Sequence, residues 1–235
     1  MTVEGVHETH FHDRRDAGRR LASVMRKFKS ANPIVLALPR GGLPVAYDVA
    51  KELKAPLDIL FVRKIGAPGH PDVDLGAVVD GAHPEIVLND SVVRMLAPDQ
   101  AHIDAETRRE LAEIERRRTL YLNGREPPEA RGRTVIVVDD GVATGGTVKA
   151  ALKAIDRHKP EWLVLAIPVA PPQALLDLQS AADEVVCLSS PEPFWAVGAY
   201  YQDFTETTDE EVMALLGANR ARMVEPDHGD THDHP

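Results

Sequence analysis

The sequence predicts an α/β fold in which a doubly wound, mostly parallel sheet is flanked by helices. Two observations support this fold class: short, unbroken apolar runs recur along the chain, and segments with helical periodicity separate them. Strands that are buried on both faces have such unbroken runs, so helices are expected on both sides of the sheet. Ligands of sheets of this kind bind at the carboxyl ends of the strands.

Composition and charge narrow the class of protein. The chain has 235 residues with 27 Lys and Arg against 37 Asp and Glu, a formal net charge of −10, which disfavours a general nucleic-acid binder. The longest apolar run, residues 162–170, is well short of the about 18 residues that cross a bilayer, so no membrane segment is expected. The N-terminus has no apolar signal region, and the single cysteine, Cys187, is expected to be buried. We therefore predict a cytoplasmic protein.

The first half of the chain contains two predicted core strands, residues 34–38 and 57–62, joined by a helix over residues 43–53. Before them, a predicted N-terminal helix carries Arg14, Arg15, Arg19 and Arg20. We favour a solvated face for these arginines over contacts with phosphate. Residues 66–76 (GAPGHPDVDLG) are predicted to be irregular because they are polar and rich in Gly and Pro, and short strands are expected at 77–79 and 86–88.

Residues 91–125 are predicted to be a helical insert, with Asp99 as an N-cap within it. Its alternating arginines and glutamates indicate a surface joined by salt bridges. The second half returns to the α/β pattern with these expected elements: strand 134–140, helix 148–158, strand 162–170, helix 171–182, strand 184–188 and a short helix 208–216 capped by Thr208 or Asp209. We predict one domain over residues 1–223 and a disordered tail over 224–235, which lacks apolar residues beyond its start.

A glycine-rich loop, GVATGGT, lies between a predicted buried strand and the start of a helix. Gly145 and Gly146 allow the backbone to approach a ligand closely, while Thr144 and Thr147 add hydroxyl donors. The amino end of the helix adds positive potential, so the loop is suited to a phosphate dianion. It is neither a Walker loop nor a dinucleotide-binding fingerprint.

Asp139 and Asp140 precede this loop directly. Two carboxylates would repel a phosphate unless they bind hydroxyl groups or a metal, and a sugar 5-phosphate satisfies both the loop and the acids. The alternative is a capping acid pair at the end of a strand. The order of strand, acid pair, T-G-G-T and helix favours the ligand-binding interpretation.

The segment VIVVDDGVATGGT resembles the phosphoribosyl-pyrophosphate (PRPP) signature of the type I phosphoribosyltransferase family. The resemblance implies that Asp139 and Asp140 hydrogen-bond the ribose hydroxyls. It also implies a set of residues around the 5-phosphate: Ala143, Thr144, Gly145, Gly146 and Thr147. Mg²⁺ would be bound mainly through PRPP, with no separate protein metal site. Homodimers occur in the family, so a homodimer is possible here by analogy.

Two further segments resemble parts of the same family's site. Arg40, Gly41 and Gly42, in PRGG at the end of the first core strand, resemble the pyrophosphate loop, in which a strained peptide bond is often found. Arg63 and Lys64 open a stretch that resembles the flexible loop that closes over the site. Cations there would stabilise the departing diphosphate. An exposed basic pair at a strand end is the alternative.

Residues 191–204 resemble the family's base-binding segment, part of a small hood formed by the N-terminal segment and residues 190–216. Phe194 or Trp195 would stack on a nucleobase, and Asp203 would bind a ring N–H or an amino group. Core packing of the aromatic residues is an alternative of nearly equal weight. The basic insert, and the absence of a lysine at the start of the hood, depart from the purine enzymes and leave the base open.

These features predict a Mg²⁺-dependent phosphoribosyltransferase of nucleotide metabolism that transfers the phosphoribosyl group of PRPP to a nitrogen nucleophile, with Arg63, Lys64 and Asp140 as catalytic residues. The acceptor is expected to be a small molecule, with no membrane or nucleic-acid partner. A PRPP-binding regulator without catalysis is the alternative from another class. A similar fold that acts on another phosphosugar is a third possibility.

Overall fold

The computed structural model describes residues 2–3, 10–80, 84–123, 125 and 127–224. Six strands form a parallel sheet in the order β1-β9-β8-β7-β2-β3. Their bounds are β1 Thr2–Val3, β2 Ile34–Ala37, β3 Leu57–Ile59, β7 Thr134–Val138, β8 Trp162–Val169 and β9 Glu184–Ser189. The α/β fold predicted from the sequence is thus confirmed, and the strand of this sheet that the sequence pattern missed is the short edge strand β1.

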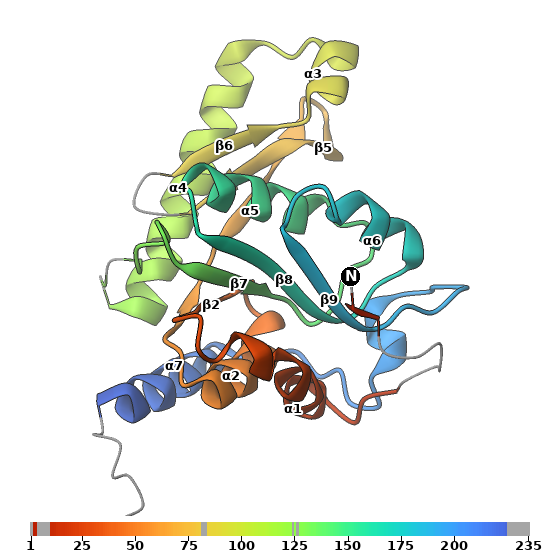
Figure 1. The fold of residues 1–235 in the computed structure, drawn as a ribbon. Coiled ribbons are helices and arrows are strands. Elements are labelled where there is room, and N and C mark those ends of the chain that lie inside the picture. The colour runs from red at the N-terminus through yellow and green to blue at the C-terminus, as the bar shows by residue number, and fades with distance from the viewer. Residues whose placement is uncertain (1, 4–9, 81–83, 124, 126, 225–235) are drawn as a thin grey trace, which may run out of the picture.

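Helices cover both faces of this sheet, with α1, α2 and α7 on one side and α5 and α6 on the other (Figure 1). Their bounds are α1 Arg14–Met25, α2 Gly42–Leu53, α5 Gly146–Arg157, α6 Pro172–Leu178 and α7 Asp209–Val224. Alternate residues of a strand point to opposite faces. In β7, Ile136 and Val138 therefore pack with α1 and α2, while Val135 and Val137 pack with α5 and α6. Two apolar cores hold the sheet between its helical layers.

A second, antiparallel sheet consists of β4 Val62–Ala67, β5 His70–Val79 and β6 Glu85–Leu88. The prediction that residues 66–76 are irregular is therefore wrong. Ala67 pairs with His70 across a tight turn in which Gly69 has a φ of +71°, a conformation that glycine adopts easily. The polar, glycine-rich composition concealed a hairpin whose strands are joined by backbone hydrogen bonds. The predicted strand 57–62 is also shorter than expected: β3 ends at Ile59, and Val62 begins β4.

The insert contains two helices, α3 Asp90–Leu96 and α4 Gln100–Leu122. Ala97 ends α3 in a left-handed conformation, with a φ of +41°, and Pro98 follows it. Asp99 caps α4 as predicted, since its carboxylate accepts a hydrogen bond of 3.1 Å from the Ala101 amide. The predicted helical insert is present, but it is divided into two helices at residues 97–99, which was not predicted from the sequence.

Some charged residues of α4 form salt bridges within the helix, and others pair with residues outside it. Glu113 pairs with Arg116 and Arg117 on the surface, and the hydrogen bonds from these arginines lower the pKa of Glu113 to about 2. Arg118 instead reaches Asp80, at the end of β5, with 2.6 Å between Nη1 and Oδ2. Only 12% and 3% of these two side chains are exposed, so α4 is anchored to the small sheet.

Two short 3-10 helices, η1 Arg26–Phe28 and η2 Val197–Tyr200, complete the regular structure. Helix α7 runs eight residues past the predicted end at 216, because its buried residues pack against α2 and β3. Thr208 caps it through a 3.2 Å hydrogen bond from the Glu211 amide to the threonine hydroxyl. Val224 is still helical, and the rest of the predicted tail lies outside the described residues. Among the helices in the described ranges, none combines the length and apolar character that crossing a membrane requires.

Candidate functional site

Two predicted loops meet because the strands that precede them are neighbours. β2 and β7 are parallel and pair in register, with Ala37 opposite Val138. The residues that follow, the PRGG turn and the acid pair, therefore leave the sheet at the same edge. The peptide bond between Pro39 and Arg40 in the PRGG turn is cis.

Positions 41 and 42 require glycine because the PRGG turn lies so close to the acid pair that a side chain would not fit. A Cβ atom on Gly41 would collide with the Asp140 carboxylate. A Cβ atom on Gly42 would lie 2.8 Å from the carbonyl oxygen of Val138 and 2.9 Å from the Cα of Asp139. The two glycines thus allow the turn after β2 to lie directly against the acid pair.

The two carboxyl groups of the acid pair are held differently. Asp139 Oδ1 accepts a hydrogen bond of 2.9 Å from the Asp140 amide, while the Asp140 carbonyl oxygen accepts one of 2.5 Å from the Tyr201 hydroxyl. Burial raises the pKa of Asp139 well above its usual value, and the neighbouring charge of Asp140 raises it further. Burial also raises the pKa of Asp140, but Arg14 opposes this shift. Asp140 is therefore the better placed of the two to remain ionised.

Arg14 is the partner of Asp140. Its Nε lies 2.7 Å from Asp140 Oδ2, its Nη1 donates to the Thr205 carbonyl at 2.7 Å, and its guanidinium lies 3.8 Å from the centre of the Phe204 ring. Asp13, the residue before Arg14, caps α1 by accepting a hydrogen bond from the Asp16 amide. Arg14 thus links the N-terminal helix, the acid pair and the segment after η2.

The expectation of a solvated arginine face on α1 is therefore wrong for two of the four arginines. Only 11% of the Arg14 side chain is exposed where it contacts the acid pair, and Arg15 makes two hydrogen bonds of 2.7 and 2.9 Å to the buried carboxylate of Asp48. Arg19 and Arg20 remain on the surface, where both pair with Asp16. The spacing of the arginines contained no signal for this division, because the partners come from distant segments.

The glycine loop forms the third side of the site. Gly145 has a φ of +81° and directly precedes α5, whose first residue is Gly146. Gly145, at the N-cap position, has no side chain with which to cap this helix, and Thr144, Gly146 and Thr147 are exposed. Unpaired amides at the first turn of a helix, together with free hydroxyl groups, provide donors for an anion.

Arg40, the cation of the PRGG turn, is held by acidic residues near the start of α7. Its guanidinium forms an ion pair with Glu206, and its Nη1 lies 3.1 Å from Asp209 Oδ1. The Tyr121 hydroxyl donates to the same Asp209 oxygen at 2.6 Å. These hydrogen bonds, first from Tyr121 and then from Arg40, lower the pKa of Asp209. The PRGG turn is thereby connected both to α7 and to the end of α4.

Arg63 and Lys64 lie on β4, and the structure does not bring Arg63 to the acid pair by any hydrogen bond. The Arg63 Nε donates instead to Glu110 Oε2 on α4 at 2.7 Å, and Glu110 is buried. Lys64 is exposed. Arg63 is therefore not part of an exposed basic pair in this structure, where its ion pair with Glu110 joins the hairpin to α4.

The predicted base-binding residues differ in how exposed they are and in what they contact. Phe194 is partly buried, with its ring 5.2 Å from that of Tyr200, while 82% of Trp195 is exposed. The Asp203 carboxylate accepts hydrogen bonds from the amide and the hydroxyl of Thr205, which lower its pKa. The partial burial of Phe194 against Tyr200 agrees with the alternative that this ring packs in the core. The exposed ring of Trp195 is free to stack on a ligand.

The sequence was also compared with known proteins. The family described as "Phosphoribosyl transferase domain" matches residues 10–204. The chain belongs to this family. The match includes the PRGG turn, the acid pair and the glycine loop, so the converging loops are those of a phosphoribosyl transferase domain.

The relatives of this phosphoribosyl transferase domain include two proteins from Mycobacterium tuberculosis strains CDC 1551 / Oshkosh and ATCC 25618 / H37Rv, provisionally named phosphoribosyl transferases MT0597 and Rv0571c. Each is 46% identical over 207 residues, or 88% of this chain. The chain spans about half of their length, 46% in both cases. A crystal structure of TT1426 from Thermus thermophilus is 45% identical, with a TM-score of 0.78 over 88% of this chain and 98% of that one.

Phosphoribosyl transferases use Mg²⁺ with PRPP, so the acid pair has to be compatible with this ion. Within the ranges that the structure describes, no group of three or more His, Cys, Asp or Glu residues could hold a metal ion. Mg²⁺ commonly takes one or two carboxylates and completes its shell with water and substrate phosphates. Asp140, the better placed of the two acids to remain ionised, would fit that limited role, with most of the ion's ligands supplied by the substrate.

Proposed function

We propose that this domain transfers the 5-phosphoribosyl group of PRPP to a nitrogen nucleophile and releases pyrophosphate. The observation that carries the proposal is the contact of Gly41 and Gly42 with Asp140 and Asp139 at adjoining strand ends. In this proposal the acid pair binds the ribose diol, the PRGG turn on one side binds the diphosphate, and the glycine loop on the other side binds the monophosphate. PRPP has these three groups in the same order.

Each loop has a role in this proposal. The amides and hydroxyls of residues 143–147 bind the 5-phosphate, and the Asp139 and Asp140 oxygens accept hydrogen bonds from the ribose hydroxyls. The backbone of Gly41 and Gly42 binds the diphosphate, assisted by Arg40. This division places the anionic groups of PRPP on backbone amides and cations, away from the two carboxyl groups.

The reaction breaks the bond between ribose C1 and the diphosphate oxygen and forms a bond between C1 and the acceptor nitrogen. The bonding electrons leave with the diphosphate, and the acceptor loses its N–H proton to solvent or to a carboxylate. Mg²⁺, when bound, neutralises part of the charge that develops on the diphosphate. Asp140 fixes the ribose, and Arg63 and Lys64 supply positive charge after a movement of the hairpin that releases Arg63 from Glu110. Positioning and charge stabilisation suffice, so no protein nucleophile is needed.

We propose a nucleobase as the acceptor, bound under the hood and stacked on Trp195. The exposure of Trp195 supports this choice over Phe194, which packs against Tyr200. Asp203 would accept a hydrogen bond from the base only after giving up part of its bonding to Thr205. Cytoplasmic nucleotide metabolism would supply both substrates.

A PRPP-binding regulator without catalysis is the second candidate. The observation that favours it is that charged groups of the site already form ion pairs within the protein. Arg14 pairs with Asp140, and Arg40 pairs with Glu206 and Asp209. A substrate has to displace or share these contacts. A protein that only senses PRPP could use this exchange as its signal.

The test is a pyrophosphate-release assay with PRPP, Mg²⁺ and a panel of purine and pyrimidine bases. Turnover with one base, lost in Asp140→Asn, supports the enzyme. Saturable PRPP binding without turnover on any base supports the regulator, and the absence of PRPP binding contradicts both. Asp156→Asn, an exposed acid on α5, is the matched control and should behave as the wild type.

A further inference from the structure

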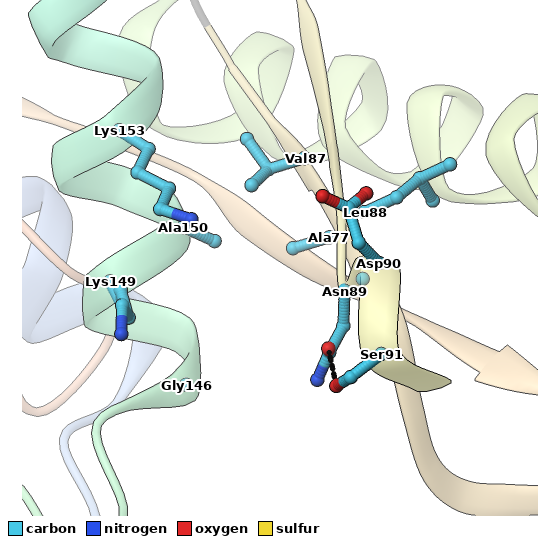
Figure 2. A pocket seen from close by; sticks show the side chains of 11 residues that line it. Ala77, Val87, Leu88, Asn89, Asp90, Ser91, Gly146, Lys149, Ala150 and Lys153 are labelled. Carbon is cyan, nitrogen blue, oxygen red and sulfur yellow. Dashed lines mark hydrogen bonds between the residues drawn. The ribbon is translucent and has the colours of Figure 1, made fainter. Parts of the chain in front are cut away.

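A cavity of about 300 Å³ lies between α5 and the small antiparallel sheet. Its two walls face each other in Figure 2: α5 forms one, and the end of β6 with the start of α3 forms the other. Gly146, the first residue of α5, belongs to the lining, so the cavity lies beside the glycine loop. Its volume is at the lower end of the range for small-molecule sites, about 300 to 1,000 Å³.

Two lysines of α5 give one wall its charge. Lys149 and Lys153 are four residues apart, so they share a helix face, and both line the cavity (Figure 2). Within the described part of the chain, neither side-chain ammonium group has a hydrogen bond or an ion pair. Arg157, the next position on the same stripe, is by contrast neutralised by Glu85 of β6. The two ammonium groups repel each other, and an anion between them would remove this repulsion.

The opposite wall adds donors and an acceptor. The Ser91 hydroxyl donates to Asn89 Oδ1 at 2.6 Å, which leaves the Asn89 amide nitrogen available as a donor (Figure 2). The Asp90 carboxylate also lines the cavity and can accept a hydrogen bond from a hydroxyl group. Ala77 and Val87 provide apolar surface on the same side. The cavity therefore combines an anion-binding part with a part suited to a carbon framework.

We propose that this cavity is a binding site for a small phosphorylated metabolite. The phosphate lies between Lys149, Lys153 and the Asn89 amide, and the carbon framework packs against Ala77 and Val87 with a hydroxyl group directed to Asp90. This site adjoins the glycine loop to which the proposed function assigns the 5-phosphate of PRPP and shares Gly146 with it, but its phosphate-binding side chains, Lys149, Lys153 and Asn89, lie outside residues 143–147. The inference does not depend on catalysis at the acid pair.

Ribose 5-phosphate and inorganic phosphate are suitable probes, titrated calorimetrically in the presence of saturating PRPP and Mg²⁺ so that the glycine loop is occupied. We expect ribose 5-phosphate to bind the wild type, and inorganic phosphate to bind more weakly because it lacks the framework. The double variant Lys149→Gln/Lys153→Gln should bind ribose 5-phosphate at least about tenfold more weakly, since two charge-assisted hydrogen bonds are lost. The control Lys51→Gln/Lys159→Gln removes the same charge from exposed lysines outside the cavity and should bind as the wild type.

Backbone NMR locates the ligand independently of PRPP. Titration of ribose 5-phosphate into the wild type should shift the amide signals of Val87, Leu88 and Ala150, and this response should be lost in the double lysine variant. Equal binding by the wild type and the double variant, or no binding by the wild type with PRPP present, would overturn the proposal. If PRPP itself fails to bind, the NMR response still tests the cavity, so failure of the proposed function is distinguishable.

Discussion

Arg14 and Asp140 are 126 positions apart in the chain, and their side chains form an ion pair with 2.7 Å between Nε and Oδ2. Only 11% and 14% of the two side chains are exposed. The same guanidinium lies over Phe204 and donates to the Thr205 carbonyl. One side chain therefore fixes the acid pair, the N-terminal helix and the hood relative to one another.

Arg14→Met is expected to destabilise the fold by about 3 kcal/mol, because it leaves the Asp140 carboxylate buried without its partner. The double variant Arg14→Met/Asp140→Asn should recover part of this loss, since the uncompensated charge is gone. Urea unfolding of the four proteins of the cycle measures the coupling. Arg19→Met, on the exposed side of α1, should change the free energy of unfolding by no more than about 0.5 kcal/mol. Equal losses at positions 14 and 19 would contradict the structural role of the pair.

Asp139→Asn is expected to make the protein more stable than the wild type as the pH rises above about 4, the ordinary pKa of an aspartate. Burial and the Asp140 charge raise the pKa of Asp139, so the folded state retains a proton that the unfolded chain has lost. The stability due to this proton is complete below about pH 4 and disappears as the pH rises through the folded pKa. An asparagine stays neutral and can still accept from the Asp140 amide. Urea unfolding at several pH values tests this, and an unchanged pH profile would show that Asp139 is ionised in the fold.

Gly42→Ala is expected to abolish PRPP binding, because the new Cβ would lie 2.8 Å from the Val138 carbonyl oxygen and push the PRGG turn away from the acid pair. The measurement is the increase in melting temperature that PRPP and Mg²⁺ produce. Gly217→Ala is the matched control. Nothing lies within 4 Å of that Cβ on α7, so the change should stabilise the helix by about 0.5–1 kcal/mol and leave the PRPP response intact. A normal PRPP response in Gly42→Ala would show that the turn tolerates a side chain.

Trp195→Ala is expected to raise the KM for the acceptor up to about tenfold, which corresponds to the loss of one stacking contact, while the KM for PRPP is unchanged. The free energy of unfolding should hardly move, because 82% of the side chain is exposed. Trp162→Ala is the control, since Trp162 begins β8 at the opposite end of the sheet and is 43% exposed. The measurement is steady-state kinetics of both variants with the base identified in the pyrophosphate-release assay. An effect on PRPP rather than on the acceptor would move Trp195 out of the base site.

The arrangement of the main sheet could be predicted from the sequence because it follows from local patterns. Unbroken apolar runs identified the strands that two helical layers cover, and the acids and glycines at the ends of two strands identified the loops. Parallel pairing of β2 and β7 then brings these loops together without any further information. The antiparallel hairpin at 66–76 was missed because backbone hydrogen bonds, which leave little trace in a polar sequence, hold it together.

By itself, the sequence determined the α/β fold, the acid pair and the glycine loop, since each is a continuous segment whose chemistry can be read along the chain. Only the tertiary structure decided which charges meet: Arg14 with Asp140, Arg40 with Asp209, and Arg63 with Glu110. The physical reason is that the partner of a charged side chain is set by the packing of whole helices and strands. The spacing of arginines along one helix contains no information about a carboxylate more than a hundred residues away.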